Sequence, residues 1–136
     1  MIKKIICFDL DNTICTTKKN YYKKSKPKKS VIKLINNLYN EGFIIKIFTS
    51  RFMGRNNENI KQASKKGFLI TANQLKKWKV FYHDLIMGKP SYDIMIDDKA
   101  FGFNKNWTNK KRNKLALFQS DLNCRAIDID QNLCYF

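Results

Sequence analysis

The sequence predicts an α/β protein organised around an open parallel sheet. Three short apolar runs, at 5–8, 43–48 and 94–96, end in polar or acidic residues. Continuous runs of this kind are typical of strands that are buried on both faces, as in parallel sheets. An amphipathic stretch at 30–41 separates the first two runs, and a strand–helix–strand unit with short links makes its two strands parallel. We therefore expect helices on both faces of the sheet.

The length and composition indicate a single domain over residues 1–136. The chain is 43% apolar, enough for a hydrophobic core, and no run approaches the ~20 apolar residues of a membrane span. The short apolar stretch after Lys3 and Lys4 is unlike a secretory signal. The four cysteines form no C-x-x-C pair and no metal-type spacing with His83, which favours free thiols in a reducing compartment. We expect a cytoplasmic protein without membrane contact.

The formal net charge is +16, from 27 Lys and Arg residues against 11 Asp and Glu residues. Such a surface attracts anionic substrates and polyanions, including nucleic acid. The excess is mostly lysine and is scattered along the chain, whereas a dedicated nucleic-acid site usually clusters arginines and aromatics on one element. We therefore favour a compositional origin of the charge, with nucleic-acid binding as the alternative.

Two carboxylates follow the first apolar run directly. Asp9 and Asp11 would lie at the rim of the sheet, where the ligands of open α/β sheets bind. Carboxylates this close repel each other unless a positive charge lies between them, and Mg2+ binds such oxygens. One of them can be a nucleophile and the other a general acid and base. The alternative is a strand end followed by an ordinary Asp–Asn turn.

The segments after these acids predict a loop, then a helix. Residues 14–30 are polar and basic and contain Pro27, which indicates an irregular loop or a small hairpin. Apolar residues at i, i+3, i+4, i+7 and i+8 predict a helix over 30–41. Ser30 is its expected N-cap and Gly42 its expected stop.

The second strand, at 43–48, ends in Thr49-Ser50-Arg51. Parallel strands end at the same edge of a sheet, so Thr49 and Ser50 should lie near the two acids. The guanidinium of Arg51 suits a phosphate group; the alternative is an ordinary surface charge.

The stretch from 52 to 80 predicts two short helices. The first covers about 56–66, and the second begins at Thr71, which forms a capping box with Gln74. A strand-like run follows at 80–82, and His83 is expected to be structural.

Lys89 then precedes a third apolar run, at 94–96, which ends in Asp97 and Asp98. Alternation along a strand sends these two acids to opposite sides, so only one of them should reach the site directly. The tail at 101–136 is expected to extend the same domain, with the end of a helix at 115–118 and an edge strand at 126–129.

These motifs resemble, in type and order, those of the haloacid-dehalogenase-like (HAD) superfamily of phosphatases and phosphotransferases. Asp9-Leu-Asp11-Asn-Thr13 is similar to the first motif, Thr49 to the second, Lys89 to the third, and the acid pair at 97–98 to the fourth. The resemblance covers residues 5–100. It implies a three-layer, Rossmann-like sheet and a Mg2+-dependent phosphatase.

The resemblance also implies a role for each residue. Asp9 would be the nucleophile and Asp11 the general acid and base, while Thr49, or Ser50 if the register differs by one, would bind a phosphoryl oxygen. Lys89 would offset the negative charge of the nucleophile and the phosphate. The Mg2+ would be held by Asp9, the Asp11 carbonyl and Asp97. Thr13 and Asp98 would support these groups.

Neither interval between the motifs is long enough for an inserted cap domain. Capless members of this superfamily act on large substrates or oligomerise, so we expect an open site or a homo-oligomer. The stretches around Arg51, Arg55, Lys89 and Ala100 are similar to small HAD-like phosphatases often encoded with capsular or lipopolysaccharide sugar genes. This implies a phosphorylated small molecule such as a sugar phosphate, with Arg51 and Arg55 as candidates for binding it.

The sequence departs from the family pattern at two positions. Asn12 replaces a common glycine, and asparagine tolerates positive φ. Ser50 stands where the narrower subgroup often has alanine.

Two other functions were weighed against the phosphatase. A phospho-accepting receiver domain also uses acids, a Thr or Ser, a Lys and Mg2+, but its lysine comes last, whereas here Lys89 precedes the final acid pair. A polynucleotide phosphatase, or a basic nucleic-acid-binding protein with weak or no catalysis, is the remaining alternative.

Overall fold

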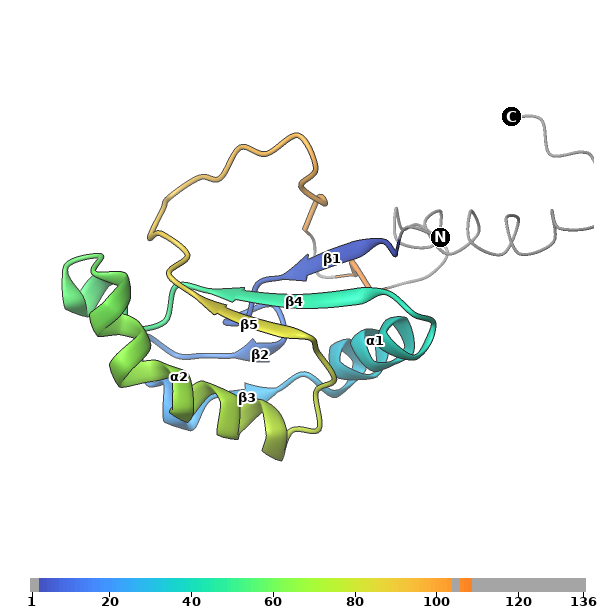
Figure 1. Cartoon of the computed structure of the whole chain (residues 1–136), viewed down its shortest axis with the longest axis horizontal. Helices are drawn as coiled ribbons and strands as arrows, with labels where there is room; N and C mark the ends of the chain where they lie inside the picture. The colour runs from blue at the N-terminus through green and yellow to red at the C-terminus, as the bar shows by residue number, and fades with distance from the viewer. Residues whose placement is uncertain (1–2, 104–105, 109–136) are drawn as a thin grey trace, which may run out of the picture. The chain divides into compact units, whose positions relative to one another are not determined.

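The computed structural model describes residues 3–103 and 106–108. It divides into two compact units, Met1–Ile94 and Met95–Phe136, and each is described by itself. All the described helices and strands belong to the first unit (Figure 1). The helix end expected at 115–118 and the strand expected at 126–129 lie outside the described residues. The single domain over 1–136 stays a prediction.

Three strands form a parallel sheet in the order β1-β4-β5. These are β1 (Ile5–Phe8), β4 (Ile44–Thr49) and β5 (Asp84–Met87). The first strand was predicted at these residues, and the second begins one residue later than expected. The α/β class with a parallel sheet is thereby confirmed.

The prediction of a strand-like run at 80–82 was wrong, because backbone groups in this stretch are hydrogen-bonded to a side chain of α1 instead of to a neighbouring strand. The side chain of Asn36 accepts a hydrogen bond from Phe81 N and donates one to Lys79 O, each at 2.8 Å. Pairing with β4 starts only at His83, whose N–H donates to Ile45 O at 2.8 Å while its Nδ1 accepts from Ile45 N at 3.0 Å. The expected structural role of His83 agrees with this contact.

Helix α1 (Lys29–Asn40) confirms the helix that the apolar periodicity predicted over 30–41. Its apolar positions are buried, and the chain leaves it through Gly42 at φ 94°, a conformation that glycine adopts readily. The N-cap is Lys28 rather than Ser30, and no side chain caps the first turn.

Helix α2 (Ile60–Lys77) is one continuous helix where two were expected. Asn59 caps it by accepting a hydrogen bond from Gln62 N at 3.0 Å. Thr71 is therefore not a cap; it is fully buried in the middle of the helix. The helix passes through Gly67, where an added Cβ would lie 2.4 Å from Phe52 Cδ2, so the glycine allows close packing there. Both α1 and α2 lie on the same side of the sheet (Figure 1).

The expected small hairpin after β1 is confirmed. Strands β2 (Cys15–Thr16) and β3 (Lys26–Pro27) pair antiparallel, and the 3-10 turn η1 (Tyr22–Lys24) lies between them. A second 3-10 turn, η2 (Gly54–Asn56), follows β4. We call residues 15–27 the flap.

The strand expected at 94–96 is not formed. Ile94 is 81% exposed and Ile96 is 95% exposed, and no strand of the described chain pairs with them. Three apolar residues between Asp93 and Asp97 bury too little surface to hold a strand without a partner. Asp97 instead closes a turn, accepting hydrogen bonds from Lys99 N at its side chain and from Ala100 N at its carbonyl.

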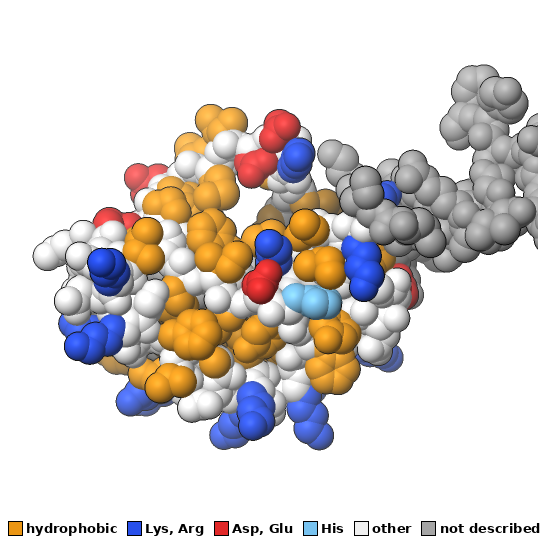
Figure 2. All heavy atoms as spheres, viewed as in Figure 1, with side chains coloured by type: hydrophobic (Ala, Val, Ile, Leu, Met, Phe, Trp, Pro, Cys, Tyr) orange, Lys and Arg blue, Asp and Glu red, His pale blue; other side chains and the backbone are white. Residues whose placement is uncertain are grey.

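None of the helices in the described part of the chain has the length and apolar character needed to cross a membrane. On the face seen in Figure 2, lysine and arginine side chains are spread around the periphery rather than gathered in one patch.

Candidate active site

The three parallel strands bring distant residues to one edge of the sheet. The register pairs Phe8 with Ile47 and Thr49 with Met87, so the strands end near one another. Asp9 follows β1, Thr49 ends β4, and Lys89 follows β5 after Gly88, whose φ is 95°. This edge is where the ligands of open α/β sheets bind.

The Asp9 carboxylate is held by two donors. Lys89 Nζ lies 2.9 Å from Asp9 Oδ1, and Thr13 Oγ1 donates to Oδ2 at 3.0 Å. The Asp9 side chain is 34% exposed, so it remains accessible beside these partners. The loop that returns Thr13 to it passes through Asn12 at φ 64°, a conformation that asparagine tolerates.

Lys89 is almost buried, and the groups around it keep its ammonium charged. Burial opposes the charged form, but hydrogen bonding to Tyr92 and Asp9 and the attraction of the Asp9 charge outweigh it, so the pKa of Lys89 is raised. The ammonium also lies 5.0 Å from the centre of the Tyr92 ring. A fixed positive charge therefore stands beside Asp9 at neutral pH.

Asp11 faces a different partner, the guanidinium of Arg51. Arg51 Nε donates to both Asp11 oxygens, at 3.1 and 2.8 Å, and Nη2 donates to Oδ1 at 2.8 Å. Thr17 of the flap also donates to Asp11 Oδ1. Arg51 is only 1% exposed, so it is not an ordinary surface charge, while the Asp11 side chain is 21% exposed and reaches solvent.

The Arg51 guanidinium joins three other segments. Its Nη1 donates to Gln74 Oε1 at 2.7 Å, and its Nη2 donates to Ser25 Oγ at 3.3 Å. The ring of Tyr22 stacks against it at 5.1 Å, and Gln74 Nε2 donates to Tyr22 O at 2.9 Å. Arg51 thereby ties the flap, α2 and the loop after β1 together. Arg51 Nε, Nη1 and Nη2 each donate to a partner within the protein, so binding of a substrate would require Arg51 to give up some of these bonds. Its contact with substrate stays a prediction.

Thr17, Ser25 and Gln74 were not identified from the sequence. Thr17 and Ser25 lie in the flap and Gln74 lies in α2, and nothing in their local patterns indicates contacts with the Asp11–Arg51 pair. Cys15 belongs to the same network, since its thiol lies 3.7 Å from Asp11 Oδ1 and 3.6 Å from Leu10 O. Burial raises the pKa of Cys15, which keeps the thiol protonated and able to donate.

The two candidate hydroxyls differ in exposure. Thr49 is 1% exposed and faces the same side of β4 as Ile45 and Ile47, while Ser50 is half-buried. Thr49 Oγ1 accepts a hydrogen bond from Arg51 N at 3.2 Å, which leaves its own hydrogen for another acceptor. The assignment of Thr49 rather than Ser50 to the phosphoryl oxygen stays a prediction.

Arg55 lies at the outer side of the flap. Its Nη2 donates to Asn20 O at 2.8 Å, and its guanidinium stacks on the rings of Tyr22 and Phe52 at 5.1 and 4.9 Å. Arg55 is exposed, so its remaining donors face solvent beside the flap.

The loop that carries Lys89 is clamped to the loop after β4. Ser91 donates to the Glu58 carboxylate through its hydroxyl at 2.7 Å and through its N–H at 3.1 Å. These two hydrogen bonds lower the pKa of Glu58. These hydrogen bonds help to fix the backbone of the loop that carries Lys89.

The residues at this edge fit Mg2+ in part. Mg2+ commonly binds through one or two carboxylates, several waters and a substrate phosphate. The accessible Asp9 carboxylate and the Asp11 main-chain carbonyl supply oxygens of the right kind. No cluster of three His, Cys, Asp or Glu side chains suited to a metal occurs in the described residues. Asp97 and Asp98 belong to the second unit, so their expected roles stay predictions.

Comparison with known proteins shows the fold more clearly than the function. No family model matches the sequence, and no curated protein is significantly similar to it. A solved structure from Vibrio cholerae, a structural-genomics target, is 26% identical over 87% of this chain and 98% of that one, with a TM-score of 0.69. This chain therefore shares its α/β fold with that protein over nearly the whole length of the latter.

Two further solved structures are less similar. They are chains of a Pnkp1/Rnl/Hen1 complex and of a Pnkp1/Rnl/Hen1 RNA repair complex, at 19% and 17% identity. They cover 71% and 88% of this chain but only 31% and 32% of their own, each with a TM-score of 0.45. Likeness at this level carries no conclusion about this chain.

Proposed function

We propose that this chain is a phosphatase that hydrolyses phosphate monoesters through an aspartyl-phosphate on Asp9. The observation that carries the proposal is the 2.9 Å contact between Lys89 Nζ and Asp9 Oδ1, which joins residues 80 positions apart at the ligand-binding edge of the sheet. An exposed carboxylate beside a fixed ammonium is suited to attack phosphorus while the charge of the incoming phosphate is offset.

In the first step an Asp9 oxygen forms a bond to phosphorus, and the bond from phosphorus to the ester oxygen breaks. The leaving oxygen takes a proton from Asp11, and Asp11 then removes a proton from the water that hydrolyses the acyl phosphate. Asp11 faces Arg51 in the arrangement described, so either transfer requires its side chain to turn from the guanidinium. Thr49 donates to a phosphoryl oxygen, and Lys89 balances the charge of the others.

Asp9 and the Asp11 carbonyl are the residues of the first unit that would hold Mg2+, which supplies further positive charge for the phosphoryl oxygens. Asp97 stays a predicted ligand. A phosphorylated metabolite such as a sugar phosphate is the substrate that we propose. An open site of this kind also fits a homo-oligomer in which a neighbouring copy covers it.

The test is phosphate release from an unselective aryl phosphate by the purified full chain, with and without Mg2+. Asp9→Asn should abolish release while leaving the urea midpoint close to that of the wild type. Asp84→Asn is the matched control, because it neutralises an exposed aspartate at the start of β5 and should keep full activity. Equal activity of Asp9→Asn and the wild type would exclude the proposed nucleophile.

A further inference from the structure

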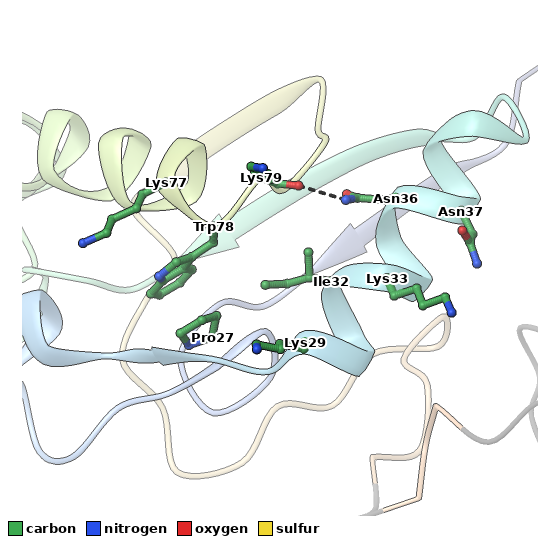
Figure 3. Close-up of a pocket in the computed structure, with 9 residues that line it drawn as sticks. All are labelled: Pro27, Lys29, Ile32, Lys33, Asn36, Asn37, Lys77, Trp78 and Lys79. Atoms are coloured by element: carbon green, nitrogen blue, oxygen red, sulfur yellow. Dashed lines mark hydrogen bonds between the residues drawn. The ribbon is translucent and has the colours of Figure 1, made fainter.

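A second feature of the first unit is a pocket of about 470 Å³ between the start of α1, β3 and the end of α2 (Figure 3). Lys29, Lys33, Lys77 and Lys79 surround it, and Pro27 and Trp78 supply apolar surface. The residues of the proposed phosphatase site do not line it. Its volume lies within the range of about 300–1,000 Å³ that is typical of small-molecule sites.

The charged side chains that line this pocket are all positive. No carboxylate is among its lining residues. Lys77 lies in the last turn of α2, where a cation also stabilises the helix dipole. Lys29 is the first residue of α1, where a cation opposes the helix dipole, and the first turn has no acidic residue. The dipole therefore does not favour Lys29, whereas a bound anion would.

The Trp78 indole gives the pocket a flat aromatic wall, and hydrogen bonds between α1 and the end of α2 hold the two sides of the pocket in place. Figure 3 shows the Trp78 indole next to Pro27, with Lys77 and Lys33 at opposite ends of the pocket. Asn36 bridges α1 to the end of α2 through its 2.8 Å bond to Lys79 O and its bond to Phe81 N. This bridge sets the spacing of the two walls before any ligand binds.

We propose that this pocket binds a nucleotide unit, with the base against Trp78 and the phosphates on the surrounding lysines. Aromatic side chains bind bases by stacking without regard to sequence, and lysines around them bind the backbone. Lys77 and Lys33 extend outward at opposite ends of the pocket (Figure 3), so a ligand with several phosphates would reach more of the lysines than a ligand with one. That ligand is either a nucleic-acid strand or a free nucleoside triphosphate, and the experiment distinguishes the two.

The pocket is connected to the loop that carries the proposed nucleophile. Pro27 and Lys29 line the pocket, and the residue between them, Lys28, donates from Nζ to Asn12 O at 2.8 Å. A nucleotide bound there would contact the same short segment that supports the loop after β1. The proposal does not depend on which ester Asp9 acts on, or on whether it acts at all.

The experiment measures binding of fluorescein-labelled oligothymidylate to the full chain by anisotropy over a range of NaCl concentrations, with unlabelled ATP as a competitor. The pocket variant is Lys33→Gln/Lys77→Gln. The matched control is Lys61→Gln/Lys65→Gln, which removes the same charge from exposed positions of α2 outside the pocket. The urea midpoints of both variants should equal that of the wild type.

We expect the pocket variant to bind the oligonucleotide about tenfold more weakly than the control variant. Loss of two phosphate contacts should also make the slope of log K against log[NaCl] shallower by about 1.4. Trp78→Leu should weaken binding about tenfold with an unchanged slope, because stacking carries no counterion release.

The competitor separates the two sources of the ligand. Displacement of the oligonucleotide by ATP at concentrations near those of the strand would assign the pocket to a free nucleotide, and failure of ATP to displace it would assign the pocket to a strand. Equal binding by the pocket and control variants, for both probes, would overturn the proposal and attribute any binding to the overall charge.

Discussion

At the scale of single residues, the sequence indicated that Arg51 lies near the candidate site but did not identify the side chains that it contacts. Its position after β4 suggested either a guanidinium that binds phosphate or an ordinary surface charge. The side chain is buried and bonded to Asp11, which excludes the surface charge and leaves phosphate binding a prediction. The contact depends on Thr17, Ser25 and Gln74, which come from the flap and α2. No local pattern at Arg51 encodes these partners, so the sequence alone could not place the guanidinium.

Arg51→Met should lower the free energy of unfolding by about 2–3 kcal/mol, since it removes a buried guanidinium and leaves the partly exposed Asp11 without its counter-charge. Urea denaturation of the full chain measures this loss. Lys46→Met is the control, because its 3.5 Å pair with Asp84 is largely exposed and should contribute at most about 0.5 kcal/mol. Similar losses in the two variants would contradict an internal role for Arg51.

At the scale of elements, prediction from the sequence succeeded where the pattern is local. Helix α1 follows from apolar periodicity, and strands β1 and β4 follow from continuous apolar runs, within a few residues. It failed where a competing contact decides the outcome. Asn36 takes the backbone groups at 79 and 81, and Asn59 caps the whole of α2, so the apparent capping box at Thr71 lies inside a helix.

The candidate site shows the same limit. The resemblance of the motifs implied that Lys89 would offset the charge of Asp9, and the two side chains are in contact. The strand that brings Lys89 there, β5, was not predicted. The partner of Asp11 was missed, since it depends on where the flap lies. The strand predicted at 94–96 was wrong, because a run of three apolar residues does not specify which strand it would pair with.

The packing of α2 predicts that Gly67→Ala destabilises the protein, whereas helix propensity alone predicts that it stabilises it. Gly67→Ala should raise helix stability by about 1 kcal/mol if propensity decided. The new Cβ would instead lie 2.4 Å from Phe52 Cδ2 and 3.1 Å from Met87 Cε, so we expect destabilisation by about 1–3 kcal/mol. Urea denaturation measures it, with Ser64→Ala one turn earlier, at a half-buried position, as the control. A more stable Gly67→Ala protein would contradict this packing.

At the scale of the whole molecule, the net charge of +16 should oppose folding at low ionic strength. We expect the urea midpoint to rise as NaCl is added up to about 0.15 M, where the Debye length is about 8 Å and repulsion between separated lysines is largely screened. The variant Lys61→Glu/Lys65→Glu should show a smaller rise. A midpoint that does not respond to salt would mean that the lysines are too far apart to repel one another appreciably.

The contact between Lys89 and Asp9 has a consequence for how the chain matures during its synthesis. The two residues are 80 positions apart, and β5 must join β4 before the ammonium reaches the carboxylate. A growing chain that has left the ribosome only as far as β4 already carries Asp9 without its counter-charge. Because such long-range contacts form late, the edge of the sheet that carries Asp9 would be the last part of this unit to reach its final arrangement. Emergence of the polypeptide beyond residue 89 would set when that happens.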